Sequence, residues 1–121
     1  MKRILIIEDD SDFRELIKNR LSYSGFEVYE AENGAEGLKK VKEISPDLIL
    51  LDIKMPEMNG YSLIKELKAN PQTASIPIII VTAYKEMEEL FKLEGIQDYV
   101  VKTQDSNLIL EKINKILKDK T

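Results

Sequence analysis

The chain has 121 residues, 43% of them hydrophobic and 33% charged, which is typical of a single soluble domain with a buried core. Its 18 basic and 22 acidic side chains give a net charge of −4, which argues against direct nucleic-acid binding. The absence of cysteine and histidine excludes disulfides, thiolate chemistry, an imidazole base and a phosphohistidine within the chain. A bound metal would therefore have oxygen ligands, which favours Mg²⁺, Mn²⁺ or Ca²⁺ over zinc.

The N-terminal apolar run does not have the form of a signal peptide, because it is four residues long and leads directly into Glu8, Asp9 and Asp10. No segment of the sequence approaches the length of a membrane span. We therefore expect a cytoplasmic protein that does not bind a membrane.

Short apolar runs alternate along the chain with stripes of apolar residues at helical spacing. The runs predict strands at 3–7, 26–31, 48–51, 76–81 and 99–101. The second run is more polar than the others, which predicts an edge strand. The helical stripes consist of Phe13, Leu16, Ile17 and Leu21; Leu38, Val41 and Ile44; Tyr61, Leu63, Ile64 and Leu67; Met87, Leu90 and Phe91; and Leu110, Ile113, Ile116 and Leu117.

Residues that favour helix ends bound these stripes. Asp10 or Ser11 is suited to capping the first helix, and Gly25 to ending it. The segment 33–36, Asn-Gly-Ala-Glu, has the form of a capping box for the second helix. The later boundaries are marked by Asn70-Pro71, by Gly95, and by Asp105 or Ser106.

Five strands thus alternate with five helices. This pattern predicts an α/β fold in which a parallel sheet is covered by helices on both faces. We expect one domain spanning residues 1–121, with no output domain.

Polar side chains follow the predicted strands at the points where the strands end. They are Glu8 and Asp9 after the first strand, Asp52 after the third, Thr82 after the fourth and Lys102 after the fifth. The C-terminal ends of parallel strands lie along one edge of the sheet, which is where open α/β sheets bind ligands. Because the run before Asp52 is continuously apolar, we expect Asp52 to lie at the end of a central strand.

The three acids converge if the first and third strands are neighbours. Unpaired carboxylates would raise one another's pKa, and a divalent cation such as Mg²⁺ would relieve the repulsion. The hydroxyl of Thr82 and the ammonium of Lys102 are suited to binding the oxygens of a phosphoryl group. Asp52, beside the metal, is then a candidate nucleophile that would form an aspartyl-phosphate.

These motifs resemble those of the response-regulator receiver domain, and the resemblance covers essentially the whole chain. The pair Glu8-Asp9 stands where the family has its metal-binding acids. Asp52, within Leu-Leu-Asp-Ile-Lys-Met-Pro-Glu-Met-Asn-Gly, matches the phosphoacceptor motif. Further matches are the hydroxyl of Thr82 with the small residue Ala83 after it, the lysine Lys102 and the switch aromatic Tyr99.

The resemblance implies a flavodoxin-like, doubly wound fold with strand order 2-1-3-4-5. It implies that Mg²⁺, or alternatively Mn²⁺, is bound by Asp9, Asp52 and the backbone carbonyl of Lys54, with Glu8 acting through a water. It also implies that Asp52 receives a phosphoryl group from a histidine kinase or a histidine phosphotransfer protein in a two-component phosphorelay. The chain would catalyse its own phosphorylation and dephosphorylation, and would not be an enzyme in the usual sense.

A conformational switch is implied as well. Thr82 would move toward the phosphoryl group and Tyr99 would turn inward. The surface formed by the fourth helix, the fifth strand and the last helix would change its preference for a downstream protein, as a shift of population between two packings. We expect a monomer, with a phosphorylation-linked dimer as the alternative.

The chain departs from the family pattern at three points. Thr103 follows Lys102, where the family usually has a proline after a cis peptide. A cis bond before a residue other than proline costs about 2.5–4 kcal/mol, so we predict a trans Lys102–Thr103 bond. The segment 82–102, with the fourth helix, is slightly shorter than is usual, and Asn59 stands where Asp is commoner.

The sequence argues against two other functions and leaves a third open. An aspartate-dependent phosphatase would carry Asp-x-Asp, but Lys54 stands at that spacing. A nucleotide or flavin binder would need a glycine-rich or hydroxyl-rich loop where residues 8–11 are Glu-Asp-Asp-Ser. A receiver-like scaffold that binds its partner without phosphorylation stays open because of Thr103 and the short fourth-helix segment, although the complete acidic pocket argues against it.

Simpler roles stay open for several side chains. Asp10 is favoured as a helix cap, Thr82 is also suited to capping the fourth helix, and Tyr99 is as compatible with core packing as with a switch role. Lys54 and Tyr84 are candidates for tuning the lifetime of the phosphoryl group by blocking or steering water.

Overall fold

The computed structural model describes residues 1–52, 60–82, 98–102 and 106–118. The strands are β1 (Arg3–Ile7), β2 (Glu27–Ala31), β3 (Leu48–Leu51), β4 (Ile78–Thr82) and β5 (Asp98–Val101). The helices are α1 (Ser11–Tyr23), α2 (Gly34–Ile44), α3 (Gly60–Ala69) and α5 (Ser106–Lys118), and none of these described helices is long and apolar enough to cross a membrane. The predicted fourth helix, with Met87, Leu90, Phe91 and Gly95, lies outside the described residues.

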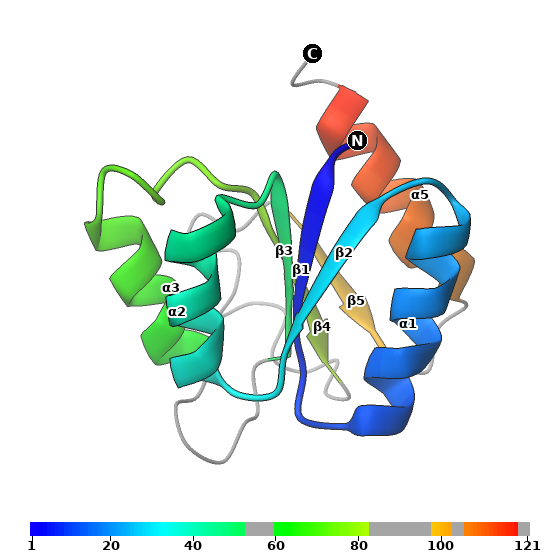
Figure 1. Cartoon of the computed structure of the whole chain (residues 1–121), viewed down its shortest axis with the longest axis horizontal. Coiled ribbons are helices and arrows are strands. Elements are labelled where there is room, and N and C mark those ends of the chain that lie inside the picture. The colour runs from blue at the N-terminus through cyan, green and yellow to red at the C-terminus, as the bar shows by residue number, and fades with distance from the viewer. Residues whose placement is uncertain (53–59, 83–97, 103–105, 119–121) are drawn as a thin grey trace.

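All five strands pair in parallel and form one sheet in the order β2-β1-β3-β4-β5 (Figure 1). This is the predicted flavodoxin-like order, in which β2 forms one edge of the sheet and β3, β4 and β5 follow on the other side of β1. The more polar strand β2 lies at the edge as predicted, and every residue of the central strand β3 is buried. The C-terminal ends of β1 and β3 are therefore neighbours.

Helices cover both faces of the sheet, with α2 and α3 on one face and α1 and α5 on the other (Figure 1). Successive side chains of a strand point to opposite faces, so each central strand contributes to two apolar cores. Leu5 belongs to the core that contains Val41 of α2, whereas its neighbour Ile4 belongs to the core that contains Ile17 of α1. The two cores hold β1 and β3 rigidly from both sides.

The predicted caps position the helices after β1 and β2. The side chain of Asp10 caps α1 and accepts a hydrogen bond from the backbone N–H of Phe13 at 3.2 Å. Asn33 caps α2 and accepts from the backbone N–H of Glu36 at 2.8 Å. Gly25, with a φ of 95°, follows the end of α1 in a conformation that favours glycine.

The prediction that Leu16 belongs to the buried stripe of α1 is wrong. Its side chain is 51% exposed, whereas Ile17 and Leu21 are fully buried. Leu16 lies beside Leu110 of α5 at the border between α1 and α5, where the core stripe ends. Its exposure depends on the position of a helix that lies far away in the sequence.

The starts of three strands also differ from the prediction, and β4 ends one residue later than predicted, at Thr82. β2 begins one residue later, because Phe26 donates its backbone N–H to Leu21 and so completes the end of α1. β4 begins at Ile78 and not at 76, because Pro77 has no N–H to donate to the sheet and contributes only its carbonyl, which accepts from Ile49. β5 begins one residue earlier than predicted, at Asp98.

Candidate functional site

The pairing of β1 with β3 brings two acids to one edge of the sheet. Ile7 and Leu51 are partners in the register, so Glu8 and Asp52 leave the two strands side by side. The backbone N–H of Asp52 still donates to the carbonyl of Ile7 at 2.9 Å, which continues the sheet by one more bond. The acids were predicted to converge if the first and third strands are neighbours, and this pairing of β1 with β3 is confirmed.

Glu8, Asp9 and Asp52 form a compact group of three carboxylates. One oxygen from each lies within 4.8 Å of the others. Asp9 is exposed, but Glu8 is only 2% and Asp52 only 6% exposed, so two of the charges are largely removed from water. Three hard oxygen donors at this spacing fit a divalent cation such as Mg²⁺ or Mn²⁺ better than zinc.

Lys102 supplies the positive charge of the site from the end of β5. Its Nζ lies 2.5 Å from Oε1 of Glu8 and 3.5 Å from Oδ2 of Asp52. β5 is two strands away from β3, and neighbouring strands are about 4.8 Å apart, so only a long side chain can bridge that distance. The convergence of Lys102 with the carboxylates, predicted from its place after a strand, is confirmed.

The ionisation of Glu8 and Lys102 reflects this crowding. Burial, together with the hydrogen bond and the negative charge of Asp52, raises the pKa of Glu8 to about 8, although Lys102 opposes the shift. Burial alone would lower the pKa of Lys102, but the ion pairs with Glu8 and Asp52 raise it above its ordinary value. Burial and the charge of Asp52 thus favour the protonated form of Glu8, whereas the two carboxylates favour the charged form of Lys102.

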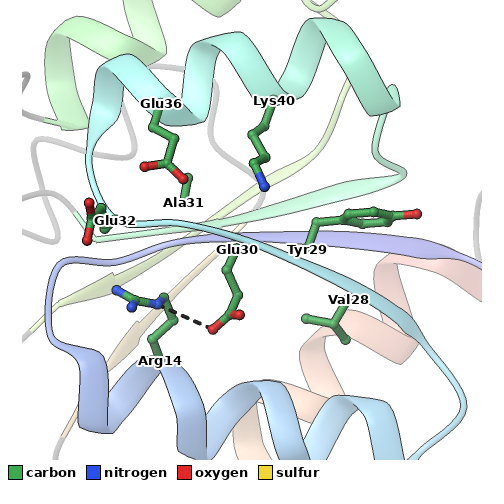
Figure 2. A pocket seen from close by; sticks show the side chains of 8 residues that line it. All are labelled: Arg14, Val28, Tyr29, Glu30, Ala31, Glu32, Glu36 and Lys40. Atoms are coloured by element: carbon green, nitrogen blue, oxygen red, sulfur yellow. Dashed lines mark hydrogen bonds and ion pairs between the residues drawn. The ribbon is translucent and has the colours of Figure 1, made fainter.

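Arg14 on α1 braces the strand end that carries the acids. Its Nη1 donates to the backbone carbonyl of Glu8 at 2.6 Å, and its Nε lies 3.3 Å from Oε1 of Glu30 on β2. Glu30 also pairs with Nζ of Lys18 at 3.2 Å. Figure 2 shows the Arg14–Glu30 contact at the edge strand β2, in a hollow of about 430 Å³ bordered by charged side chains of α1, β2 and α2. Arg14 therefore joins α1, β1 and β2 next to the carboxylates.

Sequence patterns did not identify Arg14 or the role of Phe13 at this site. Phe13 was assigned to the apolar stripe of α1, and it does border that core, but its ring also lies 4.9 Å from Nζ of Lys102. Both contacts depend on how α1 lies across the sheet, which no local spacing encodes. The only local signal was the cap at Asp10, which fixes where the first turn of α1 begins.

The remaining predicted residues are placed as follows. Thr82 is the last residue of β4, level with Val101 of β5, and so lies at the same edge of the sheet. Tyr99 is half-buried against the core beneath α2 and α3, with Nζ of Lys112 5.9 Å from its ring centroid.

Asp10 is the cap of α1, which was the favoured interpretation. The other predicted residues that lie outside the described part are Lys54, Asn59, Ala83, Tyr84, Thr103 and Asp105, together with the Lys102–Thr103 bond.

Comparison with known proteins agrees with this geometry. The response regulator receiver domain family matches residues 4–114. The chain is 42% identical to the chemotaxis protein CheY of Bacillus subtilis over 95% of this chain and 97% of that protein. It is 35% identical to protein PilH of Pseudomonas aeruginosa, covering 97% of this chain and 98% of that protein.

Solved structures give the same result. The response regulator protein TrrA of Thermotoga maritima, solved in complex with Mg²⁺ and BeF, has a TM-score of 0.86 and 36% identity over 95% of this chain and 98% of its own. A response regulator from Chloroflexus aurantiacus has a TM-score of 0.91 and 27% identity over 97% and 98%. The chain is therefore a member of the response regulator receiver family, whose domains act in two-component signalling.

Proposed function

We propose that this protein is the phosphoacceptor of a two-component phosphorelay and that Asp52 carries the phosphoryl group. The observation that carries the proposal is the position of the Asp52 carboxylate. It is nearly buried, lies within 4.8 Å of oxygens from Glu8 and Asp9, and lies 3.5 Å from the ammonium of Lys102. A carboxylate with a metal-suited group on one side and a fixed cation on the other is arranged for reaction with an anionic phosphoryl donor.

The proposed step is a phosphoryl transfer from a phosphohistidine. One oxygen of Asp52 attacks phosphorus, the P–O bond forms, the P–N bond to the imidazole of the donor breaks, and the imidazole leaves with a proton from solvent. Lys102 binds oxygen atoms of the phosphoryl group and compensates their charge as the bond changes. Mg²⁺ supplies further neutralisation of the phosphoryl oxygens when it is bound. The ligands of the ion would be Asp9, Asp52 and the carbonyl of Lys54, with Glu8 acting through a water.

Hydrolysis reverses the signal at the same residue. Water attacks phosphorus, the P–O bond to Asp52 breaks, and inorganic phosphate leaves. The chain then assists its own phosphorylation and dephosphorylation but turns over no separate substrate. The similar protein TrrA was solved in complex with Mg²⁺ and BeF, which supports the proposal that this chain binds a divalent cation.

The output is a change in the surface that a partner recognises. Thr82 and Tyr99 would report the phosphoryl group to the surface of β5 and α5, and the half-buried position of Tyr99 beside the core supports this coupling. The partners would be a histidine kinase or a histidine phosphotransfer protein upstream and another protein downstream, in the cytoplasm. We propose a monomer, with phosphorylation-linked dimerisation as the alternative.

Phosphoramidate tests the proposed chemistry, because its P–N bond is similar to that of a phosphohistidine. The purified protein is incubated with phosphoramidate and Mg²⁺ and followed by phosphorus NMR, alongside Asp52→Asn. We expect an acyl-phosphate signal in the wild type and none in the variant. A wild type that remains folded and gives no acyl-phosphate signal would contradict the proposal.

A further inference from the structure

Phe13 lies against the ammonium group of Lys102. The distance from Nζ of Lys102 to the centroid of the Phe13 ring is 4.9 Å, which is within the range of a cation–π contact. The backbone of Phe13 is held in the first turn of α1, because its N–H donates to Oδ1 of Asp10 at 3.2 Å. The ring is therefore attached to a capped helix and not to a loop.

The ring also fills space next to the carboxylates. Phe13 borders a small hollow together with Glu8 and Asp52, and the hollow measures about 10 Å³, the lower limit for one water molecule. The other lining residues are apolar, among them Ile17 and Val81 of the core beneath α1. A shorter aliphatic side chain at position 13 would enlarge this hollow and admit water beside the carboxylates of Glu8 and Asp52.

Lys102 needs such a support because of its length. Its flexible four-carbon side chain bridges two strand spacings to reach Asp52, and 19% of its surface is exposed. The ion pair with Glu8 fixes the ammonium from the side of the carboxylates only. The face of an aromatic ring restrains the ammonium from a second direction and adds no hydrogen-bond acceptor that would compete with a phosphoryl oxygen.

We propose that Phe13 is a positioning residue for Lys102, and that its ring fixes the ammonium where the phosphoryl group binds. This inference rests on the proposed phosphorylation of Asp52. A phenyl ring has no group that could bind a phosphoryl oxygen or coordinate a metal ion, so we expect its effect to pass through the lysine.

The direct test is the NMR signal of Lys102. The ring should shift the Hε resonances of Lys102 upfield, and this shift should be lost in Phe13→Leu and kept in Phe13→Tyr. The matched control is Phe26→Leu, since Phe26 is also a partly buried phenylalanine against the same core. An Hε resonance that does not move in Phe13→Leu would overturn the inference, and this readout does not depend on whether Asp52 is phosphorylated.

Phosphorylation and metal binding give two opposed readouts. Phe13→Leu should slow phosphorylation by acetyl phosphate by between about 2-fold and about 30-fold, the range of a lost cation–π contact. Its affinity for Mg²⁺, measured by calorimetry, should stay the same or rise, because a looser lysine competes less for the carboxylates. A packing defect alone would weaken both properties, and Phe26→Leu calibrates that effect.

A double-mutant cycle then tests whether the effect of Phe13 on the phosphorylation rate depends on Lys102. In a Lys102→Met background, Phe13→Leu should have no further effect on the phosphorylation rate. An equal loss of rate in both backgrounds would overturn the inference. If the wild type itself takes up no phosphoryl group, the proposed function fails, while the Hε shift and the Mg²⁺ affinity still decide whether Phe13 positions Lys102.

Discussion

The ammonium of Lys102 lies 2.5 Å from Oε1 of Glu8, a carboxylate with only 2% of its surface exposed. Lys102 thus places next to the carboxylates a positive charge of the kind that a divalent cation would also supply. The site contains three carboxylates against one ammonium, so it retains an affinity for added positive charge. A proton, a metal ion and Lys102 therefore compete for the same oxygens.

The first prediction concerns the stability of the metal-free protein as pH changes. The pKa of Glu8 is about 8 in the folded chain, mainly because of burial, against an ordinary value of 4.5. Between these values the folded chain holds a proton that the unfolded chain has released, so the free energy of unfolding falls as pH rises. The pKa of Lys102 is raised, so the lysine stays protonated throughout and adds no slope in this window.

Urea denaturation in EDTA at several pH values from 5 to about 8 measures this slope. Because other carboxyl groups contribute their own pH dependence, the relevant quantity is the difference between the wild type and Glu8→Gln. We expect the variant to gain stability relative to the wild type as pH rises. A difference that is constant with pH would show that Glu8 does not titrate in this range.

The second prediction concerns Arg14, which donates to the backbone carbonyl of Glu8 at 2.6 Å. Arg14→Met should lower the free energy of unfolding by about 1.5–3 kcal/mol, the range for a charged hydrogen bond. It should also weaken Mg²⁺ binding, because the strand end that carries Glu8 and Asp9 loses its brace. Denaturation and calorimetry with Mg²⁺ measure the two effects.

Arg20→Met is the matched control for that brace. Arg20 lies on the same helix and bonds to Asn107 of α5, away from the carboxylates. We expect Arg20→Met to leave the Mg²⁺ affinity unchanged and to lower the free energy of unfolding by less than about 1 kcal/mol, because the Arg20–Asn107 bond is exposed to solvent. Equal losses of Mg²⁺ affinity in both variants would mean that charge alone, and not the contact with Glu8, explains the effect of Arg14.

The third prediction concerns the packing of α2 against β1. A Cβ added at Gly37 would lie 2.5 Å from Cδ1 of Ile7, the residue before Glu8. Gly37→Ala should therefore destabilise the protein by about 1–3 kcal/mol through overpacking. Ile7→Val removes Cδ1, so the double variant should be more stable than the sum of the two single effects predicts. Strictly additive losses, measured by denaturation, would rule out this contact as the cause.

Much of the fold could be predicted because the central strands are uniformly apolar. β1 and β3 lie exactly where their apolar runs were predicted, and the caps at Asp10 and Asn33 begin α1 and α2 as predicted. The starts of β2 and β4 could not be predicted from apolar runs. The start of β2 depends on a hydrogen bond at the end of α1, and that of β4 on the missing N–H of Pro77. Leu16 was misassigned because its exposure is decided by the distant helix α5.

The candidate site likewise combines residues that could be predicted from the sequence with residues that could not. Glu8, Asp9, Asp52 and Lys102 could be predicted to converge, because each follows a strand and parallel strands end at one edge. The contacts of Arg14 with Glu8 and of Phe13 with Lys102 could not be predicted, because they arise from the way α1 packs across the sheet. A helical stripe shows that Phe13 faces inward but does not show which charged group it meets.

The measurement that tests the central claim most directly is the intact mass of the protein after incubation with acetyl phosphate and Mg²⁺. Wild type, Asp52→Ala and wild type with EDTA are compared under the same conditions. We predict a single phosphoryl adduct on the wild type, and none on the variant or with EDTA. A folded wild type without an adduct, or an adduct that persists in Asp52→Ala, would contradict the assignment of Asp52 as the metal-dependent phosphoacceptor.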